Sequence, residues 1–486
     1  MKEDKKKVFI KNFGCQMNEA DSELVYSMLL AQGYQKANSY KDADVILFNT
    51  CSVRKHAEDR VWGKVGELKK LKENVTVPIF AGGSAKAKTG RPHFPIIGII
   101  GCMARAQKGR IFERLPHVNF ICGPSNIYEV GDLIEQVLED PEGHFSAIGK
   151  RKRPVKKGTV PIFAKTSTKA KLGQSPFYRE EKIRAWVNIS YGCDNFCSYC
   201  IVPYVRGRET SRKSEDIIDE IKMLVDDGVK EVTLLGQNIN SYGQSSAVGH
   251  QSSDFVKLLE EINKIPILLR IRFMTSHPKD ASIDLFKAMR DLDKVCEHLH
   301  LPFQSGSDRI LKLMNRKYTA NNYLKLIEQY RKIVNGGSVT TDVIVGFPTE
   351  TEEDFYKTYM LMKEGKFDSA FIFKYSPRPY TAAYKMKDDI KKEAKEERNQ
   401  SLLRLQDRIK KKRNKLLINT IQQALGTKKA KRGPISYYCE NGKYYLNGRT
   451  RTNMQVIYEG NPELIGHLSD VKIKDIEENT LIGKRV

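Results

Sequence analysis

The chain lacks any long apolar run. Hydrophobic residues make up 40% of its 486 residues, yet no uninterrupted stretch approaches the roughly 18 residues that a membrane-spanning helix needs. The first residues are polar and rich in lysine, without the apolar segment of a secretory signal. These absences argue against a membrane-embedded protein, and we expect a soluble protein of the cytoplasm.

Acidic residues are in the minority. The chain has 59 aspartates and glutamates against 83 lysines and arginines, which gives a formal net charge of +24. Such an excess suits a polyanionic partner, because cations that contact phosphates release condensed counterions. A lysine-rich surface also simply keeps a protein in solution, and charge alone does not separate the two readings.

A complete set of internal disulfides is impossible, because the nine cysteines are an odd number. The chain also lacks the small secreted format in which disulfide frameworks are usual. Thiolate chemistry or metal binding is therefore the better expectation for these side chains.

The length predicts about three domains. Buried-type strands at 8–10, 45–48, 96–100 and 118–121 alternate with amphipathic helices, the first of which stops near Gly33. This alternation predicts an α/β domain with a parallel sheet over residues 1–148. Residues 149–181 show no periodicity, which predicts a basic linker. For the basic run 151–157 within it, the alternatives are a localisation signal or a segment that contacts RNA.

The βα alternation resumes near Ala185. Six strands are expected, at 185–190, 231–235, 268–273, 297–301, 339–345 and 370–375. Six units in place of eight predict an incomplete (βα)6 barrel over residues 182–407. A charged helix over about 390–417 leads to short β-type runs at 444–446, 455–458 and 470–476, which predict a small all-β barrel over residues 408–486.

The strongest local signal is the segment Gly192-Cys193-Asp194-Asn195-Phe196-Cys197-Ser198-Tyr199-Cys200. Three thiolates on one short loop can hold three irons of a cubane cluster and leave the fourth iron open for a small molecule. The loop directly follows the first barrel strand, at the end where barrel chemistry is done. The alternative is a zinc site, which needs a fourth ligand, and no Cys or His in the surrounding segment supplies one.

Three further cysteines, Cys15, Cys51 and Cys102, each lie just beyond the end of a predicted parallel strand of the first domain. Ligands of open α/β sheets bind at that edge, so the three could converge on one site. A free cysteine is by itself more often a buried small apolar residue. Three cysteines in equivalent positions weaken that alternative.

The CxxxCxxC loop on a partial barrel resembles the radical S-adenosylmethionine superfamily. The resemblance implies that the open iron binds S-adenosylmethionine, whose reductive cleavage gives a 5′-deoxyadenosyl radical, while the barrel positions the cofactor and keeps water away. The three N-terminal cysteine segments resemble the methylthiotransferase family, whose cysteines hold a second, auxiliary cluster. Further segments match the same family: 234–238, 275–278, 300–307, 342–348, 375–379 and 448–453.

This resemblance spans nearly the whole chain and implies a set of roles. Cys193, Cys197 and Cys200 would hold the radical [4Fe-4S] cluster, and Cys15, Cys51 and Cys102 the auxiliary one. Gln237, Ser276 and Gln304 follow barrel strands and are candidates for binding S-adenosylmethionine, although each is equally suited to capping a loop or reaching substrate. Cys122, Cys296 and Cys439 match no ligand position and are assigned to packing, and His277 and His300 to structure.

The segment from Cys51 to Val61 is similar to the MiaB type of this family, which methylthiolates carbon 2 of N6-isopentenyladenosine next to the anticodon. Sibling types act on threonylcarbamoyl-adenosine or on a ribosomal protein. The resemblance further implies tRNA as partner, an electron donor such as a flavodoxin or ferredoxin, and a monomer. The C-terminal segment resembles the RNA-binding TRAM barrel, whose Arg449, Arg451, Lys472 and Lys474 are expected to grip the RNA backbone. The alternative is a barrel that only packs against the radical domain, with Arg449 and Arg451 in intramolecular salt bridges.

Three departures from the family pattern stand out: a longer loop around 92–95, the long basic linker, and Tyr380 where glycine is usual after Pro379. A hypothesis from another class is a non-catalytic RNA-binding protein whose iron–sulfur clusters are structural or redox-sensing. Production of 5′-deoxyadenosine from S-adenosylmethionine separates the two, since only the enzyme makes it.

Overall fold

The computed structural model describes residues 5–52, 55–69, 95–149, 178–243, 253–430 and 444–486. The chain folds as two compact units, one formed by residues 1–180 with 192–194 and 200–208, the other by 181–191, 195–199 and 209–486. No helix in the described part is long and apolar enough to cross a bilayer. Residues 92–94 of the longer loop, most of the basic linker and Cys439 lie outside the described residues.

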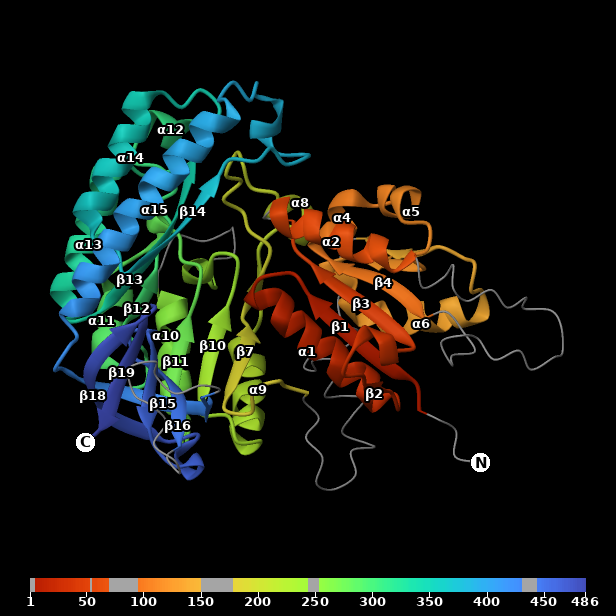
Figure 1. The fold of residues 1–486 in the computed structure, drawn as a ribbon, viewed down its shortest axis with the longest axis horizontal. Coiled ribbons are helices and arrows are strands. Elements are labelled where there is room, and N and C mark those ends of the chain that lie inside the picture. The colour runs from red at the N-terminus through yellow and green to blue at the C-terminus, as the bar shows by residue number, and fades with distance from the viewer. Residues whose placement is uncertain (1–4, 53–54, 70–94, 150–177, 244–252, 431–443) are drawn as a thin grey trace. The chain divides into compact units, whose positions relative to one another are not determined.

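The first unit is built on one parallel sheet with the strand order β2-β1-β3-β4-β5-β6 (Figure 1). Its strands are β1 (Lys7–Asn12), β2 (Gln35–Lys36), β3 (Val45–Thr50), β4 (Ile96–Gly101), β5 (Phe120–Cys122) and β6 (Phe145–Ala147). The helices between them are α1 (Gln16–Ala31), α2 (Lys55–Glu67), α4 (Cys102–Gln107), α5 (Arg110–Arg114) and α6 (Val130–Glu139). The predicted α/β domain is present; the short outer strands β2 and β6 are additions.

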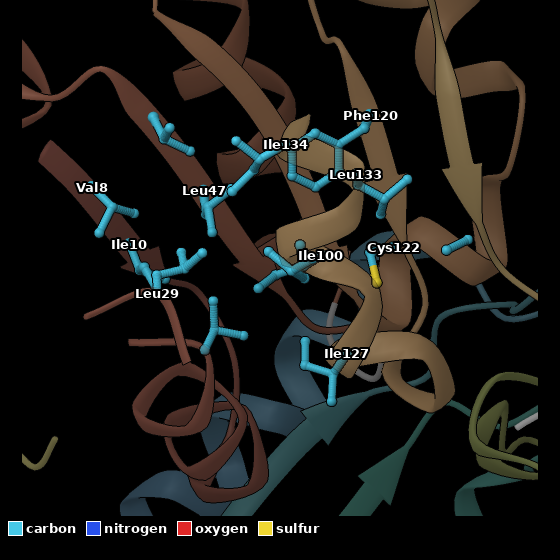
Figure 2. Packing of buried hydrophobic residues seen from close by; sticks show 14 of the residues in the cluster. Val8, Ile10, Leu29, Leu47, Ile100, Phe120, Cys122, Ile127, Leu133 and Ile134 are labelled. Carbon is cyan, nitrogen blue, oxygen red and sulfur yellow. The ribbon is translucent and has the colours of Figure 1, made fainter. Parts of the chain in front are cut away.

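Both faces of this sheet are buried, as a parallel sheet requires. Val8, Leu47 and Ile100 point to one face, where they pack with Leu29 of α1 and Leu133 of α6 (Figure 2). Alternate residues of the same strands fill a second core on the opposite face: Ile46, Phe48, Ile97 and Ile99, with Val61 and Val65 of α2. Each such side chain contributes roughly 1.5–3 kcal/mol when fully buried, so the two cores hold the strand ends in register.

The second unit contains the six expected parallel strands. They are β7 (Arg184–Asn188), β10 (Glu231–Leu235), β11 (Arg270–Phe273), β12 (His298–His300), β13 (Ser338–Val345) and β14 (Ser369–Lys374). Hydrogen bonding groups them as β11-β10-β7 and β12-β13-β14, and a parallel bridge between Ile271 and Val295 joins the two groups. The predicted incomplete barrel is therefore confirmed.

Helices follow these strands in the order of a βα barrel (Figure 1). They are α9 (Ser214–Asp226), α10 (Ser253–Asn263), α11 (Ile283–Asp291), α13 (Ala320–Ile333), α14 (Glu352–Gly365) and α15 (Lys392–Lys415), with a short α12 (Asp308–Leu313) before α13. Ser282, Thr319 and Thr351 begin α11, α13 and α14 by accepting a hydrogen bond from a backbone N–H of the first turn. Such caps cost roughly 1 kcal/mol to remove, which explains why the helices start where they do.

The C-terminal segment forms a closed barrel of order β15-β16-β17-β19-β18. Its strands are β15 (Ile421–Lys429), β16 (Tyr445–Thr450), β17 (Gln455–Glu459), β18 (Leu468–Glu477) and β19 (Thr480–Arg485). Leu446, Val456, Tyr458, Val471 and Ile473 fill its interior. The predicted domain boundary at residue 408 falls inside α15, and the barrel begins only at Ile421, because the charged helix runs on to Lys415.

The arginines of the segment 448–453 are only partly exposed and make bonds within the chain. Arg451 donates to both carboxylate oxygens of Glu297, at 2.6 and 2.7 Å, and to the carbonyls of Asp293 and Val295. Arg449 donates to Asn453, and burial lowers the pKa of its guanidinium to about 10. The two arginines therefore bond within the chain, as the alternative of intramolecular contacts expects, and an RNA grip by them stays a prediction.

Side chains at the N-terminal ends of the large barrel's strands donate hydrogen bonds to the same segment. Arg270 donates to the carbonyls of Arg449 and Gln423, and Arg272 donates to those of Thr450 and Arg451. A further bond runs from Ser338 Oγ to the carbonyl of Thr452. The small barrel thus closes the N-terminal end of the large one, the end at which α/β barrels carry stability and not chemistry.

Candidate active site: two cysteine sets at strand ends

The cysteines of the first domain lie at the carboxyl edge of three neighbouring strands. In the sheet β1 pairs with β3 and β3 with β4, with Asn12 opposite Asn49 and Thr50 opposite Gly101. Cys51 and Cys102 directly follow β3 and β4, and Cys15 begins the turn into α1. The register therefore places the three thiols along one edge, as the sequence predicted.

A buried network of amides fixes two of these strand ends. Asn18 donates to Asn49 Oδ1 at 2.8 Å, and Asn49 returns a bond to the Asn18 carbonyl at 2.7 Å. The side-chain oxygen Oδ1 of Asn18 in turn accepts a hydrogen bond from the backbone N–H of Cys15 at 3.2 Å. Because both asparagines are fully buried, leaving either amide unpaired would cost about 1–3 kcal/mol, so the network sets the position of the Cys15 turn.

Gly101 is required where β4 turns into α4. Its φ is +93°, and a Cβ at this position would stand 2.6 Å from the Thr50 carbonyl oxygen and 2.7 Å from Asn49 Oδ1. Only glycine tolerates both the left-handed backbone and the close approach. This turn lets Cys102 begin α4 at the sheet edge.

Cys102 has a cationic neighbour. Arg206 donates a hydrogen bond to its thiol and pairs with Asp21 at 3.1 Å, and Cys15 lies within the electrostatic range of the same guanidinium. Burial raises the pKa of the Cys102 thiol, while Arg206 acts in the opposite direction. Despite its own burial, Arg206 has a raised pKa because Cys102 and Asp21 favour the charged form, so it is a permanent cation.

The neighbouring Cys122 behaves differently. It ends β5 inside the hydrophobic core of Figure 2, is fully buried, and donates to the Asn126 carbonyl at 3.1 Å. Burial raises its pKa far above the ordinary range. Cys122 is therefore a core residue, as is Cys296, which is also buried. Both agree with their predicted roles in packing.

The loop 193–200 is anchored where it begins. Its first cysteine donates from its backbone N–H to the Gly207 carbonyl at 3.2 Å. The preceding Gly192 has a φ of +72°, and a Cβ there would lie 2.2 Å from the Arg208 carbonyl. Gly192 therefore has the same steric reason as Gly101 to stand before a cysteine.

Cys197, the middle cysteine of this loop, is buried and has its own arginine. Arg316 Nη1 lies 3.5 Å from Cys197 Sγ, and its Nη2 donates to the Pro302 carbonyl at 2.7 Å. The adjacent Ser198 donates to the carbonyls of Met314 and Leu313. Burial opposes the charge of Arg316, but Tyr318, Tyr199 and Cys197 raise its pKa well above the ordinary value.

The polar side chains that follow the barrel strands include acceptors without a partner. In the described part of the chain, Ser276 Oγ and Gln304 Oε1 are buried and accept no hydrogen bond. The same holds for Asn188 Oδ1 at the end of β7 and for Ser190 Oγ just after it. Thr275 and Gln304 also have φ near +70°, a strained conformation that clusters at functional sites. Unsatisfied buried groups at this end fit a polar ligand such as S-adenosylmethionine.

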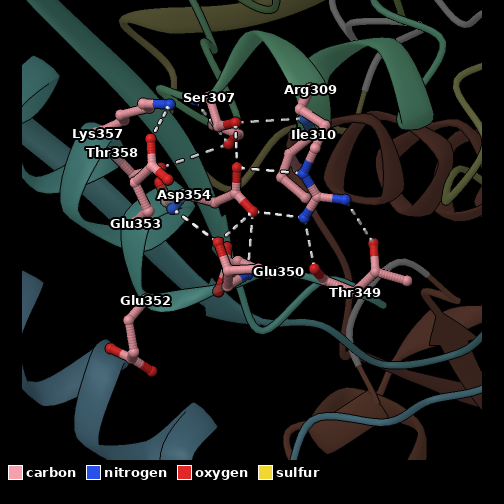
Figure 3. Close-up of polar contacts among 12 residues, drawn as sticks. Ser307, Arg309, Ile310, Thr349, Glu350, Glu352, Glu353, Asp354, Lys357 and Thr358 are labelled. Atoms are coloured by element: carbon pink, nitrogen blue, oxygen red, sulfur yellow. Dashed lines mark hydrogen bonds and ion pairs between the residues drawn. The ribbon is translucent and has the colours of Figure 1, made fainter.

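A carboxylate network holds the loop that carries Gln304. Asp354, in the first turn of α14, accepts from Ser307 Oγ at 2.5 Å and from Arg309, and caps the helix through Thr351 (Figure 3). Burial acts against its charge, but the bonds from Arg309 and Ser307 hold its pKa below the usual range. The network ties 302–309, the segment after β12, to the start of α14, which keeps Gln304 at the strand end.

Within the described residues, no three Cys, His, Asp or Glu side chains stand close enough together to hold a single metal ion. The thiolates of a cubane cluster each bind a different iron and not one shared ion. The residues present, thiols at glycine-fixed turns next to buried arginines, fit iron–sulfur clusters.

Sequence reasoning missed the two arginines. Arg206 follows the last cysteine of the loop by six positions and Arg316 belongs to a later segment, and neither lies in a cysteine motif. The available signal for Arg206 was its nearness to the loop. Nothing in the sequence marked Arg316 before the fold brought it to Cys197. Gln237 follows β10 as predicted.

Two family models match the chain. One, described as the radical SAM superfamily, covers residues 187–362, and the other, described as uncharacterized protein family UPF0004, covers residues 7–123. Their limits coincide with most of the partial barrel and with the cysteine-bearing part of the first sheet. The similar solved structure of a radical S-adenosylmethionine methyltransferase from Kitasatospora setae, TsrM, has a TM-score of 0.51 at 12% identity, covers 78% of this chain and 74% of its own, and supports the fold alone.

Curated relatives match over nearly the whole chain. A protein of Clostridium beijerinckii is 43% identical over 99% of this chain and 96% of its own length, and one of Protochlamydia amoebophila is 40% identical over 98% and 96%. A third, of Thermoanaerobacter sp., is 43% identical over 98% and 92%. All three are named tRNA-2-methylthio-N(6)-dimethylallyladenosine synthase. With its cysteine sets, its partial barrel and relatives of this identity and coverage, the chain belongs to the tRNA-2-methylthio-N(6)-dimethylallyladenosine synthase family of radical SAM enzymes.

Proposed function

We propose that this protein is a radical S-adenosylmethionine enzyme that methylthiolates carbon 2 of N6-isopentenyladenosine next to the anticodon of tRNA. The observation that carries the proposal is the pair of cysteine sets, each at the carboxyl ends of parallel strands, in a chain that matches named relatives at 40–43% identity. A binding protein with one structural cluster has no need for two such sets. An enzyme that delivers both a radical and a sulfur needs two such sets.

Each cysteine set has one assigned task. Cys193, Cys197 and Cys200 hold the cluster that binds S-adenosylmethionine, and Cys15, Cys51 and Cys102 hold a second cluster that presents the sulfur. Held in this way, the clusters together with two molecules of S-adenosylmethionine would supply the methylated sulfur and the radical chemistry needed to activate carbon 2.

The protein side chains bind and orient the reactants. Ser276 and Gln304 offer buried acceptor oxygens to the ammonium or hydroxyl groups of S-adenosylmethionine, and Gln237 follows the neighbouring strand. The Asp354 network fixes the Gln304 loop, so its oxygen is in place before the cofactor arrives. Preorganised acceptors bind a cofactor without a further ordering cost.

Arg449 and Arg451 already bond within the chain, so we expect further cations of the small barrel to contribute to RNA binding. Exposed cations on its strands are Lys428, Lys429, Lys474, Lys484 and Arg485. Such side chains bind phosphates through counterion release, so binding should weaken steeply with salt. Substitution of Lys474, Lys484 and Arg485 by Ala should reduce both the affinity for tRNA and the slope of its salt dependence, and an unchanged slope would place the RNA site elsewhere.

The reaction also needs an electron, for which we propose a flavodoxin or ferredoxin as donor, and we propose that the protein acts as a monomer. The proposed enzyme is tested by anaerobic reconstitution with iron and sulfide, followed by incubation with S-adenosylmethionine and a strong reductant. Formation of 5′-deoxyadenosine is expected. Its absence from a protein with full iron would favour the non-catalytic RNA-binding alternative.

A further inference from the structure

The chain segment after Cys200 packs against the helix that begins with Cys102. Helix α8 (Val202–Arg206) starts two residues beyond Cys200. Ile201 and Val205 form a small buried cluster with Cys102 and Ala106 of α4. Because α8 is short and buried on this side, the side chain of its last residue, Arg206, is held next to the first turn of α4.

Arg206 is a fully desolvated cation between thiols and one carboxylate. Its side chain and that of Asp21 are each only 5% exposed and form an ion pair of 3.1 Å. The same guanidinium donates to the Cys102 thiol and interacts with the charge of Cys15. With its fork of N–H donors, arginine can bind Asp21 and a sulfur at the same time.

Stability alone does not explain this arrangement. A buried ion pair is often no better for stability than apolar residues of the same volume, since desolvation offsets the attraction. A cubane held by three thiolates, in contrast, brings net negative charge into a buried site. Net charge and hydrogen bonds to the sulfurs are the properties that set its reduction potential.

We propose that Arg206 is a positioning residue that hydrogen-bonds the Cys102 sulfur and sets the reduction potential of the auxiliary cluster, with Asp21 holding its guanidinium in place. This inference rests on the proposed auxiliary cluster and names the residue that tunes it. It links the two cysteine sets through one segment of chain, because the residue that tunes the N-terminal set stands six positions after the last cysteine of the radical loop.

Removal of the positive charge of Arg206 and removal of the negative charge of Asp21 should shift the reduction potential of the cluster in opposite directions. Loss of the positive charge in Arg206→Met should lower the reduction potential, because the reduced cluster carries one more negative charge than the oxidised one. Loss of the negative charge in Asp21→Asn should raise the potential. Arg206→Lys keeps the charge without the fork and should fall between wild type and Arg206→Met.

The test uses the full chain with Cys193, Cys197 and Cys200 replaced by Ala, so that the remaining iron belongs to the auxiliary site. Each variant is reconstituted anaerobically, its iron is counted, and its potential is measured by redox titration followed by visible absorbance and by the EPR signal of the reduced cluster. The matched control is Arg105→Met, which removes an arginine of helix α4 whose hydrogen bond, among the described residues, goes to the Gly149 carbonyl and not to a cysteine. The control should keep the wild-type potential.

Opposite shifts for Arg206→Met and Asp21→Asn, with Arg206→Lys close to wild type, would support the inference. Shifts in the same direction, or full iron with an unchanged potential in all variants, would show that Arg206 only packs the interior. If Arg206→Met fails to hold iron, Asp21→Asn and Arg206→Lys still decide by the sign of their shifts. A background chain that binds no iron at all would refute the proposed auxiliary cluster, and the role of Arg206 with it.

Discussion

The two ends of the partial barrel are built from the same strands but carry opposite chemistry. At the N-terminal ends, charged side chains such as Arg272 and Glu231 are buried and bound to one another or to backbone carbonyls. At the C-terminal ends, Ser276 and Gln304 are neutral and have buried acceptor oxygens without a partner among the described residues. Single atoms at the N-terminal end, such as Arg270 Nε and His298 Nδ1, also have no hydrogen-bond partner among the described residues, but these side chains bond through their other atoms. Ser276 Oγ and Gln304 Oε1 at the C-terminal end are neutral acceptors, which suits the ligand that we propose there.

The two ends of each barrel strand carry different polar side chains, and an apolar middle separates them. Substitutions at the two ends should therefore have different effects. Changes at the N-terminal end should affect stability and leave cofactor binding per folded molecule alone. Changes at the C-terminal end should do the reverse. The same division applies to the N-terminal sheet, where Cys15, Cys51 and Cys102 stand at the carboxyl edge.

The largest effect should come from the C-terminal end. Replacement of Cys193, Cys197 and Cys200 by Ala should abolish 5′-deoxyadenosine production, because no thiolates remain to hold the iron that binds the cofactor. High-performance liquid chromatography of the anaerobic reaction measures this directly. Retained production in the triple variant would refute the assignment of the loop.

Loss of the three cysteines at the carboxyl edge of the first sheet should affect methylthio transfer and iron content more than cofactor cleavage. Replacement of Cys15, Cys51 and Cys102 by Ala should leave some abortive cofactor cleavage, end methylthio transfer, and remove about four irons per chain, roughly half of the total. The control is Cys122→Ala, which removes a core thiol from the same sheet and should keep all the iron. Equal iron in both variants would mean that these three cysteines only pack the core.

The N-terminal end of the barrel should respond in stability. Glu231→Ala leaves Arg272 buried without its carboxylate, whose oxygen lies 2.9 Å from Arg272 Nε, and should lower the free energy of unfolding by about 3–5 kcal/mol. The exposed Glu260→Ala serves as control and should change it by less than about 0.5 kcal/mol. Denaturant unfolding measures both. Similar stabilities would show that the buried pair is not needed to close this end.

The segment 449–452 bears on the same comparison, because it supplies carbonyl partners to Arg270 and Arg272. A chain truncated after α15 loses those partners. We therefore expect the truncated protein to unfold more readily, whereas a free-standing RNA-binding barrel would leave the remainder unaffected.

A matched pair of serines sharpens the contrast at the C-terminal end. Ser276→Ala removes a buried hydroxyl whose oxygen has no partner in the described residues, so it should leave stability unchanged but weaken S-adenosylmethionine binding about fivefold, the loss of roughly 1 kcal/mol. Ser282→Ala removes the cap of α11 and should cost about 1 kcal/mol of stability with no effect on affinity. If calorimetry and unfolding gave both variants the same profile, Ser276 would have no part in the cofactor site.

The smallest effect concerns Tyr380. It has a φ of +72° and is 54% exposed, which gives a physical reason for glycine being usual at this position. Tyr380→Gly removes the left-handed strain but adds chain entropy in the unfolded state, so thermal unfolding should show a gain of at most about 1 kcal/mol. A loss above that size would show that the tyrosine ring makes contacts that outweigh the strain.

Much of the fold was predictable, because it depends on local patterns. The β10 strand was predicted at its exact bounds from an apolar run, and the six barrel strands were all found. The strands β2, β6, β15 and β19 were not, since their apolar alternation is short or interrupted by charge. The cysteines could be placed at strand ends because parallel strands share one carboxyl edge.

The partners of the arginines were not predictable from the sequence, although intramolecular salt bridges of Arg449 and Arg451 were one of the two expectations for them. Arg449 and Arg451 stand in a basic motif that fits RNA, and only the docking of β16 under the large barrel shows that Arg451 binds Glu297. Arg206 and Arg316 reach their cysteines through tertiary contacts, which no spacing rule encodes. Long-range ion pairs depend on packing of separate elements, so they follow from the fold and not from a motif.

The central claim is tested most directly by mass spectrometry of nucleosides from the tRNA of cells that lack the gene. The account predicts that the 2-methylthio form disappears while N6-isopentenyladenosine accumulates, and that the wild-type gene restores it but the Cys15, Cys51 and Cys102 variant does not. An unchanged 2-methylthio-N6-isopentenyladenosine level, or loss of the methylthio group from threonylcarbamoyl-adenosine in its place, would contradict it.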